Sequence, residues 1–138
     1  MTRMVCHSFA DFPAFIVSGG HETPKKVSVY SLSGGWEVSS CSIPKLPKNR
    51  YQHTMDLNII CGGGGGADSM TSCIKMTTAG WVTSHELLYK RLGHSSWVVD
   101  DGIILMGGQH AGKRTEIAKW DGTTEELFAL ENYIEYGL

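Results

Sequence analysis

Short aliphatic runs, each closed by two glycines, recur along this 138-residue chain. The runs cover residues 15–18, 59–61 and 104–106, and the pairs that close them are Gly19-Gly20, Gly62-Gly63 and Gly107-Gly108. Consecutive pairs lie 43 and then 45 residues apart. A short aliphatic run bounded by glycine is typical of a buried strand, and the regular spacing indicates a repeated structural unit.

More strand-like segments follow each Gly pair. Segments 27–30, 73–76 and 116–120 are rich in β-branched or aromatic residues, which favours strands. A turn and an aromatic residue come next in two units, Trp36 and Trp81, whereas the third unit has Leu127-Phe128. In the third unit, segments 97–99 and 103–106 flank Asp100-Asp101-Gly102, and we expect the Asp-Gly pair to supply the positive φ angles of a two-residue hairpin turn.

An arginine and a histidine stand ahead of each Gly pair. Arg50 and His53 recur as Arg91 and His94, and a looser form spans residues 3–7. Each unit therefore contains four short predicted strands, and helical patterning is weak and confined to residues 125–136. A single small sheet cannot bury both of its faces, so such units must stack, and radial stacking of four-stranded sheets makes a propeller. The sequence predicts an all-β fold, a partial propeller of about three four-stranded antiparallel blades.

The ordered recurrence of these marks resembles the kelch family of β-propellers over residues 3–130. The resemblance implies one kelch-repeat region over residues 1–138, with units at about 3–49, 50–90 and 91–130 and a short tail at 131–138. The stretch 41–81 is similar to a sub-group of invertebrate kelch-like proteins, many of them extracellular. Gly93-His94 and Trp120-Asp121 mimic the marks of WD-repeat propellers, but they do so once, and the Gly pair is foreign to that family.

Several of the repeated residues are expected to be architectural. A strand crowded by its neighbours needs residues without Cβ, which accounts for the six paired glycines. The large aromatic side chains are expected to pack between adjacent sheets; these are Tyr30, Trp36, Trp81, Trp97 and Trp120. His53 and His94 are expected to bond loop backbone, and Arg50 and Arg91 to tie the connections between blades through their five donors.

Composition narrows the classes of partner. The formal net charge is -2 and the lysines and arginines form no stripe, so nucleic acid is not expected as a partner. No uncharged run is long enough for a membrane-spanning helix, and no signal-peptide pattern opens the sequence. The chain is therefore expected to be cytoplasmic if it is complete, and extracellular if it is a fragment of a secreted protein.

Cysteine pairing is left open between two cases. Cys61 ends one predicted strand and Cys73 begins the next, so antiparallel pairing would place them opposite each other and permit a disulfide. Cys6 with Cys41 would follow by elimination. The other case is four reduced and mostly buried thiols.

Catalytic, cofactor and metal sites are not expected. The run Gly62–Gly66 is followed by Ala67-Asp68-Ser69, so it lacks the Gly-Lys-[Ser/Thr] ending of a phosphate-binding loop. Equivalent histidines of a propeller are rotated about the axis and not clustered, which disfavours a metal site. The copper-radical galactose oxidase has kelch-like blades, so a galactose-oxidase-like or carbohydrate-binding domain is an alternative, although no copper-ligand set can be mapped onto this chain.

The leading hypothesis is a non-enzymatic module that binds a protein partner through inter-strand loops. The candidate residues follow the Gly pairs and should line one rim: His21, Glu22, Lys25, Lys26, Asp68, Ser69, Thr71, Gln109, His110, Lys113 and Arg114. A fragment of a ubiquitin-ligase substrate adaptor is a further alternative. Three blades do not close a ring, so we expect either a part of a longer kelch protein or a homo-oligomer.

Overall fold

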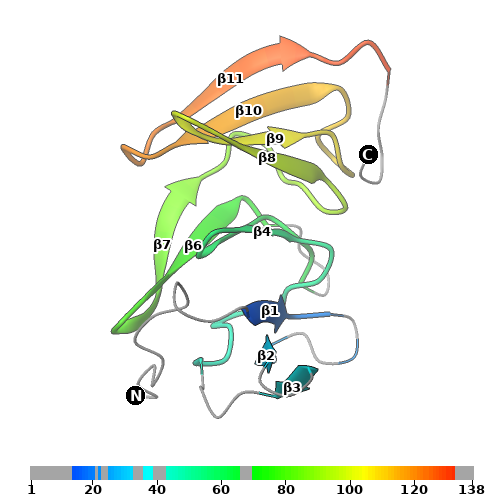
Figure 1. The fold of residues 1–138 in the computed structure, drawn as a ribbon. Helices are drawn as coiled ribbons and strands as arrows, with labels where there is room; N and C mark the ends of the chain where they lie inside the picture. The colour runs from blue at the N-terminus through cyan, green and yellow to red at the C-terminus, as the bar shows by residue number, and fades with distance from the viewer. Residues whose placement is uncertain are drawn as a thin grey trace.

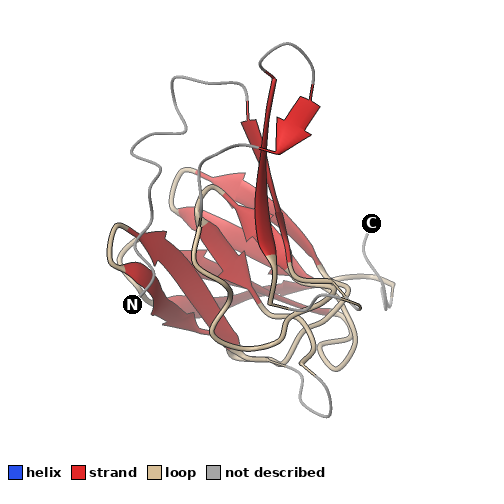
Figure 2. Ribbon diagram, turned by 90° about the horizontal axis from the view of Figure 1, so that it is seen from below, coloured by secondary structure: helices blue, strands red, loops and turns tan. Residues whose placement is uncertain are grey.

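The predicted all-β class is confirmed. The computed structural model describes residues 14–20, 22, 25–32, 36–38, 43–65 and 70–132, and these contain eleven strands and no helix. Figure 2 shows the described part as strands joined by loops. No helix in this part is long and apolar enough to cross a membrane.

The strands form three antiparallel sheets, which we call the first, middle and last sheets. The first sheet has the order β1-β2-β3, with β1 at Ala14–Ser18, β2 at Val27–Leu32 and β3 at Trp36–Val38. The middle sheet has the order β4-β5-β6-β7, at Thr54–Asp56, Ile59–Cys61, Ser72–Thr77 and Gly80–Glu86. The last sheet has the order β8-β9-β10-β11, at Ser95–Val99, Gly102–Met106, Arg114–Lys119 and Thr124–Ala129.

The three sheets stack in chain order, with the middle sheet between the other two (Figure 1). Each is a simple meander, so the predicted four-stranded units are confirmed in the middle and last sheets. The first sheet has three strands within the described residues. The weak helical expectation at 125–136 is wrong where the structure describes it, because β11 continues to Ala129.

The hairpin between β8 and β9 is present, but its predicted turn chemistry is wrong. Val99 pairs with Gly102, so the two turn residues are Asp100 and Asp101, and neither has a positive φ. Gly102 is instead the first residue of β9, where an added Cβ would lie 2.8 Å from Cα of Lys119 on the neighbouring strand. Close approach of two strands, and not turn geometry, therefore explains this glycine.

Two apolar interfaces hold the stack together. On one face of the middle sheet, Ile60 and Ile74 are buried against Leu46, with Val27 of the first sheet packed beside them. On the opposite face, Ile59, Cys61 and Cys73 pack with Leu87 and with Ile103 and Leu105 of the last sheet. The alternation Ile59-Ile60-Cys61 thus serves both interfaces, because successive strand residues point to opposite faces.

Cys61 and Cys73 form a disulfide, as one of the two sequence-based cases predicted. They are cross-strand partners on β5 and β6, with Cα atoms 4.1 Å apart. Both lie in the interface between the middle and last sheets. The described part of the chain contains no free cysteine, and the suggested pairing of Cys6 with Cys41 lies outside it.

The predicted packing of large aromatic residues is only partly correct. Trp81 is partly buried against both clusters that join the first and middle sheets, and its Nε1 donates to the carbonyl of Pro44 at 2.8 Å. Trp97 and Trp120 are 66% and 44% exposed, so they do not lie between sheets. Tyr30 is partly buried, and the side chain of Trp36 lies outside what the structure describes.

Candidate functional site

Each repeated arginine is buried, and its guanidinium binds two backbone carbonyls of its own unit. One carbonyl belongs to the Gly pair and the other to the first residue of the third strand. Arg50 Nη1 donates to the carbonyls of Gly62 at 2.8 Å and Ser72 at 3.0 Å. Arg91 Nη1 makes the same two bonds one unit later, to Gly107 at 2.7 Å and Arg114 at 2.9 Å. These shared bonds establish that Ser72 and Arg114 occupy equivalent positions, both at the start of the third strand of their sheet.

The backbone of the same arginines reaches back to the preceding sheet. The carbonyl of Arg50 accepts from the N–H of Gly20 at 3.0 Å, and the carbonyl of Arg91 accepts from Gly63 at 2.7 Å. Each arginine therefore connects two consecutive Gly pairs, one through its main chain and one through its guanidinium. We call each such set an arginine joint: Arg50 with Gly20, Gly62 and Ser72, and Arg91 with Gly63, Gly107 and Arg114.

The two joints compensate their buried charge differently. Arg91 Nε pairs with Glu116 Oε1 at 2.8 Å, and neither side chain has exposed surface. Arg50 has no carboxylate at ion-pair distance among the described residues, and its Nε has no acceptor there. Burial lowers the pKa of Arg50 to about 10, an effect that Glu86 partly opposes.

The repeated histidines bond hydroxyls of the preceding sheet and not loop backbone, which corrects the sequence-based expectation. His53 Nε2 lies 2.8 Å from Ser18 Oγ, and His94 Nε2 lies 2.9 Å from Thr54 Oγ1. Burial, with the nearby arginine in second place, lowers the pKa of His53 to about 4 and that of His94 to about 3. Both rings are therefore neutral at pH 7.

The Gly pairs fit against these rings. Gly62 has φ +65, and a Cβ there would lie 2.7 Å from the carbonyl oxygen of Arg91 and 2.8 Å from Cε1 of His94. Gly19 has φ +67 and faces His53 in the same way, with Cε1 at 2.7 Å. The first glycine of these two pairs must thus lack a side chain for two reasons, the backbone conformation and the contact with the next unit.

The structure brings two of the predicted rim residues together. Lys25, from the loop between β1 and β2, and Thr71, from the loop before β6, line one cavity of about 510 Å³. Lys48, Asn49, Ser72 and Glu86 also line it. We call it the lysine cavity. The backbone bond from Leu46 N to Lys25 O, at 2.9 Å, holds the two lysine-bearing segments side by side.

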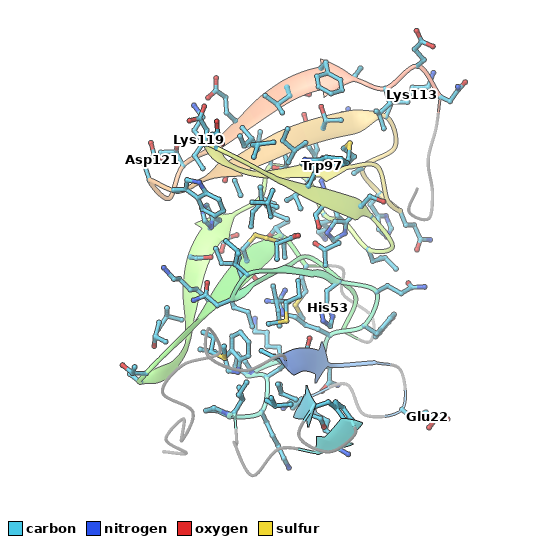
Figure 3. The ribbon with its side chains drawn as sticks, viewed as in Figure 1. Glu22, His53, Trp97, Lys113, Lys119 and Asp121 are labelled. Atoms are coloured by element: carbon cyan, nitrogen blue, oxygen red, sulfur yellow. A yellow bond between two sulfur atoms is a disulfide. The ribbon has the colours of Figure 1, made fainter. Side chains whose placement is uncertain are left out.

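The other predicted rim residues that the structure describes are not among the residues that line that cavity. Lys113 and Arg114 are exposed, and Figure 3 shows Lys113 and Glu22 on one side of the stack, with Lys119 and Asp121 on the other. Exposed positions are also found for Glu22, Lys26 and His110, while Gln109 is half-buried and its N–H donates to the carbonyl of Leu92 at 2.9 Å. His21, Asp68 and Ser69 fall outside the described residues.

Tyr89 is a site residue that sequence reasoning missed. Its ring lies beneath two guanidinium groups, with Arg114 Cζ 4.6 Å and Arg91 Cζ 5.8 Å from the centroid. Its hydroxyl donates to Glu126 Oε1 at 2.9 Å, and this bond raises the pKa of Tyr89. Tyr89 stands two residues before Arg91, and Lys48 stands at the equivalent position before Arg50. This equivalence is the sequence signal that could have identified Tyr89.

The described residues contain no group of three or more His, Cys, Asp or Glu side chains placed to hold a metal ion. Five of the six paired glycines, together with Arg50, Arg91, His53 and His94, take part in the arginine joints or the contacts between rings and glycines. The lysine cavity is a concave polar surface in the described part of the chain, and its lysine side chains are available to a ligand. No known protein family and no curated protein matches the sequence.

Proposed function

We propose that this chain is a non-enzymatic protein–protein interaction module, a partial kelch-type β-propeller that binds through the loops at the Gly-pair ends of its sheets. The observation that carries the proposal is the lysine cavity, because residues that follow the Gly pairs of two consecutive units, Lys25 and Thr71, meet in its wall. Propellers keep a rigid scaffold and vary the loops at its rim, which suits such a surface to recognition.

Two features support the propeller arrangement. The arginine joint is used between the first and middle sheets and again between the middle and last sheets, with the same backbone bonds. Because the same contacts join each sheet to the next, further sheets can stack through the same contacts, as in repeat proteins. In this arrangement the middle and last sheets are complete four-stranded blades.

The outward face of the last sheet supports the idea of a partner beyond the chain's own sheets. Trp97, Ile104 and Ile117 lie in one row across β8, β9 and β10, on the face opposite the buried Leu105. The corresponding face of the middle sheet, which carries Ile59 and Cys61, is covered by the last sheet. We propose that Trp97, which is 66% exposed, and the half-buried Ile104 beside it are covered either by a second copy or by a further blade of a longer protein.

A capture experiment tests the interaction role. Immobilised chain is incubated with extract from the native source, and captured proteins are identified by mass spectrometry. We expect Lys113→Ala with Arg114→Ala to reduce capture of the specific partners, because both side chains are exposed and follow the third Gly pair along the chain. Lys75→Ala with Lys119→Ala removes the same charge elsewhere and should leave capture intact. Unchanged capture by the first pair would contradict the proposed rim.

A further inference from the structure

The two arginine joints differ at the residue two places before the arginine. In the joint between the middle and last sheets this residue is Tyr89, whose ring packs beneath Arg91 and Arg114. In the joint between the first and middle sheets it is Lys48, which is exposed, and Ser72 stands where Arg114 stands one unit later. The space beside Lys48 is the lysine cavity.

The walls of the cavity are rich in positive charge. Lys25 and Lys48 line it, and Lys26 and Lys45 are exposed on the same two segments. These four ammonium groups stand in a chain whose formal net charge is -2. Glu86 is the only carboxylate among the described residues that line the cavity, and its Oε2 already accepts from Thr71 Oγ1 at 3.2 Å. A volume of about 510 Å³ lies within the range of ligand-binding clefts.

A buried cation stands behind one wall. Arg50 is 1% exposed, and its Nη2 donates to Ser72 Oγ at 2.7 Å. The Ser72 oxygen is therefore used as an acceptor, which leaves the hydroxyl hydrogen for an acceptor in the cavity. Arg50 has no carboxylate at ion-pair distance among the described residues, so its charge is only partly offset by Glu86 and adds to the positive potential that reaches a ligand at Ser72.

We propose that the lysine cavity binds an acidic segment of a protein partner. Carboxylates of the segment pair with Lys25 and Lys48, and the Ser72 hydroxyl donates a hydrogen bond to one of them. A nucleic acid is disfavoured, because Glu86 stands in the wall and the lysines form a cluster and not a stripe along a backbone. This inference rests on the proposed function and specifies the part of the partner that is bound, an acidic segment.

Fluorescence anisotropy with defined peptides tests the proposal. The probes are a fluorescein-labelled peptide of repeated glutamate and the same peptide with glutamine in place of glutamate. We expect the native chain to prefer the glutamate peptide by about tenfold at low ionic strength, with the preference falling as salt is added. Lys25→Gln with Lys48→Gln should remove the preference. Lys75→Gln with Lys90→Gln is the matched control, because both lysines are exposed outside the cavity.

Three outcomes would overturn the proposal: equal binding of the two peptides by the native chain, an unchanged preference in the Lys25/Lys48 variant, or an equal loss in the control variant. Displacement of the peptide by sodium acetate at the same carboxylate concentration would overturn the assignment to a peptide and leave a site for small anions. Failure here with a specific loss of capture in the Lys113/Arg114 variant would leave the proposed interaction role standing.

Discussion

The guanidinium of Arg91 and the carboxylate of Glu116 form an ion pair, with Nε and Oε1 at 2.8 Å and no exposed surface on either side chain. The pair belongs to the joint that holds the last sheet on the middle one, because Glu116 Oε2 also accepts from the backbone N–H of Leu88 at 2.7 Å. In the preceding unit Ile74 occupies the position of Glu116, and Arg50 remains without a carboxylate among the described residues. One joint is thus charge-compensated and the other is not.

Arg91→Met should destabilise the fold by about 3–5 kcal/mol, because it leaves the Glu116 charge buried and unpaired. Adding Glu116→Ile, the residue type found at the equivalent position 74, should restore part of that loss. Urea unfolding followed by circular dichroism measures both values. A loss below about 1 kcal/mol in the single variant, or no recovery in the double variant, would contradict a role for the pair in joining the sheets.

Gly62→Ala tests the contact between a Gly pair and the next sheet. The variant must hold Ala at φ +65 and must place its Cβ 2.7 Å from the Arg91 carbonyl oxygen. Gly80→Ala is the matched control, since Gly80 has φ +118 but no atom within 4 Å of the added Cβ. We expect the free energy of unfolding to fall by at least about 2 kcal/mol more for Gly62→Ala than for the control. Equal losses would show that only the backbone angle matters.

Stability should decrease as the pH falls below about 6.5, the ordinary pKa of histidine. Burial lowers the pKa of His53 to about 4 and that of His94 to about 3, so the unfolded chain binds protons at a higher pH than the folded chain does. Stability present above pH 6.5 is then lost as the pH falls toward about 4, by up to about 1.4 kcal/mol per pH unit for each histidine.

Urea midpoints between pH 7 and pH 5 measure this effect, in a range above most carboxylate titration. His94→Asn removes one of the two groups and should reduce the slope. A stability that is constant over this range would contradict the burial of neutral histidines.

Leu57→Gly should stabilise the chain. Leu57 is the first of two turn residues between β4 and β5, has φ +55 and is 70% exposed. A two-residue turn with positive φ at its first residue alone is the pattern of a type II′ turn, which favours glycine there. We expect a gain of about 0.5–1 kcal/mol, measured as a rise in the urea midpoint. Leu57→Ala keeps the unfavourable conformation and should give no gain.

The repeat was predictable from the sequence because its marks are chemically unusual and regularly spaced. Gly62 and His94 contact each other across two sheets, and each recurs one unit away at a similar interval. A glycine that is packed against backbone cannot be replaced by another residue type without a loss of stability. The spacing of these glycines along the chain therefore reflects the spacing of the stacked sheets. The disulfide was one of two cases that the sequence left open, and the structure shows it because Cys61 and Cys73 are cross-strand partners at the two ends of one inter-strand loop.

The direction of the large aromatic side chains could not be predicted in the same way. Trp97 pairs with Ile104 on the face of the last sheet that no other described sheet covers, so Trp97 is 66% exposed where the sequence pattern indicates burial, while Ile104 is half-buried. Trp120 lies at the turn between β10 and β11, where its Nε1 donates to the carbonyl of Asp100 at 2.7 Å. The strand register and the number of sheets, neither of which is encoded locally, decide both cases.

The lysine cavity was missed for a related reason. Lys25 and Lys48 are 23 residues apart in the first unit and lie side by side because the backbone of Leu46 bonds to that of Lys25. Lys25 was identified as a rim residue from its place after a Gly pair, but Lys48 lies in a connection between sheets and carries no mark of its own. Tyr89 stands at the equivalent position one unit later, and the structure shows that its ring packs against Arg114. Only with that packing known does the lysine at position 48 stand out as a difference between the two units.

The mass of the chain in solution tests the partial-propeller account most directly. Light scattering over a range of protein concentrations should give a mass above the 15.1 kDa of one chain, because Trp97 is 66% exposed on a face of the last sheet that no described sheet covers. Trp97→Lys should return the mass to 15.1 kDa without loss of the strand signal in circular dichroism. A native chain that is folded and remains at 15.1 kDa at every concentration would contradict the account.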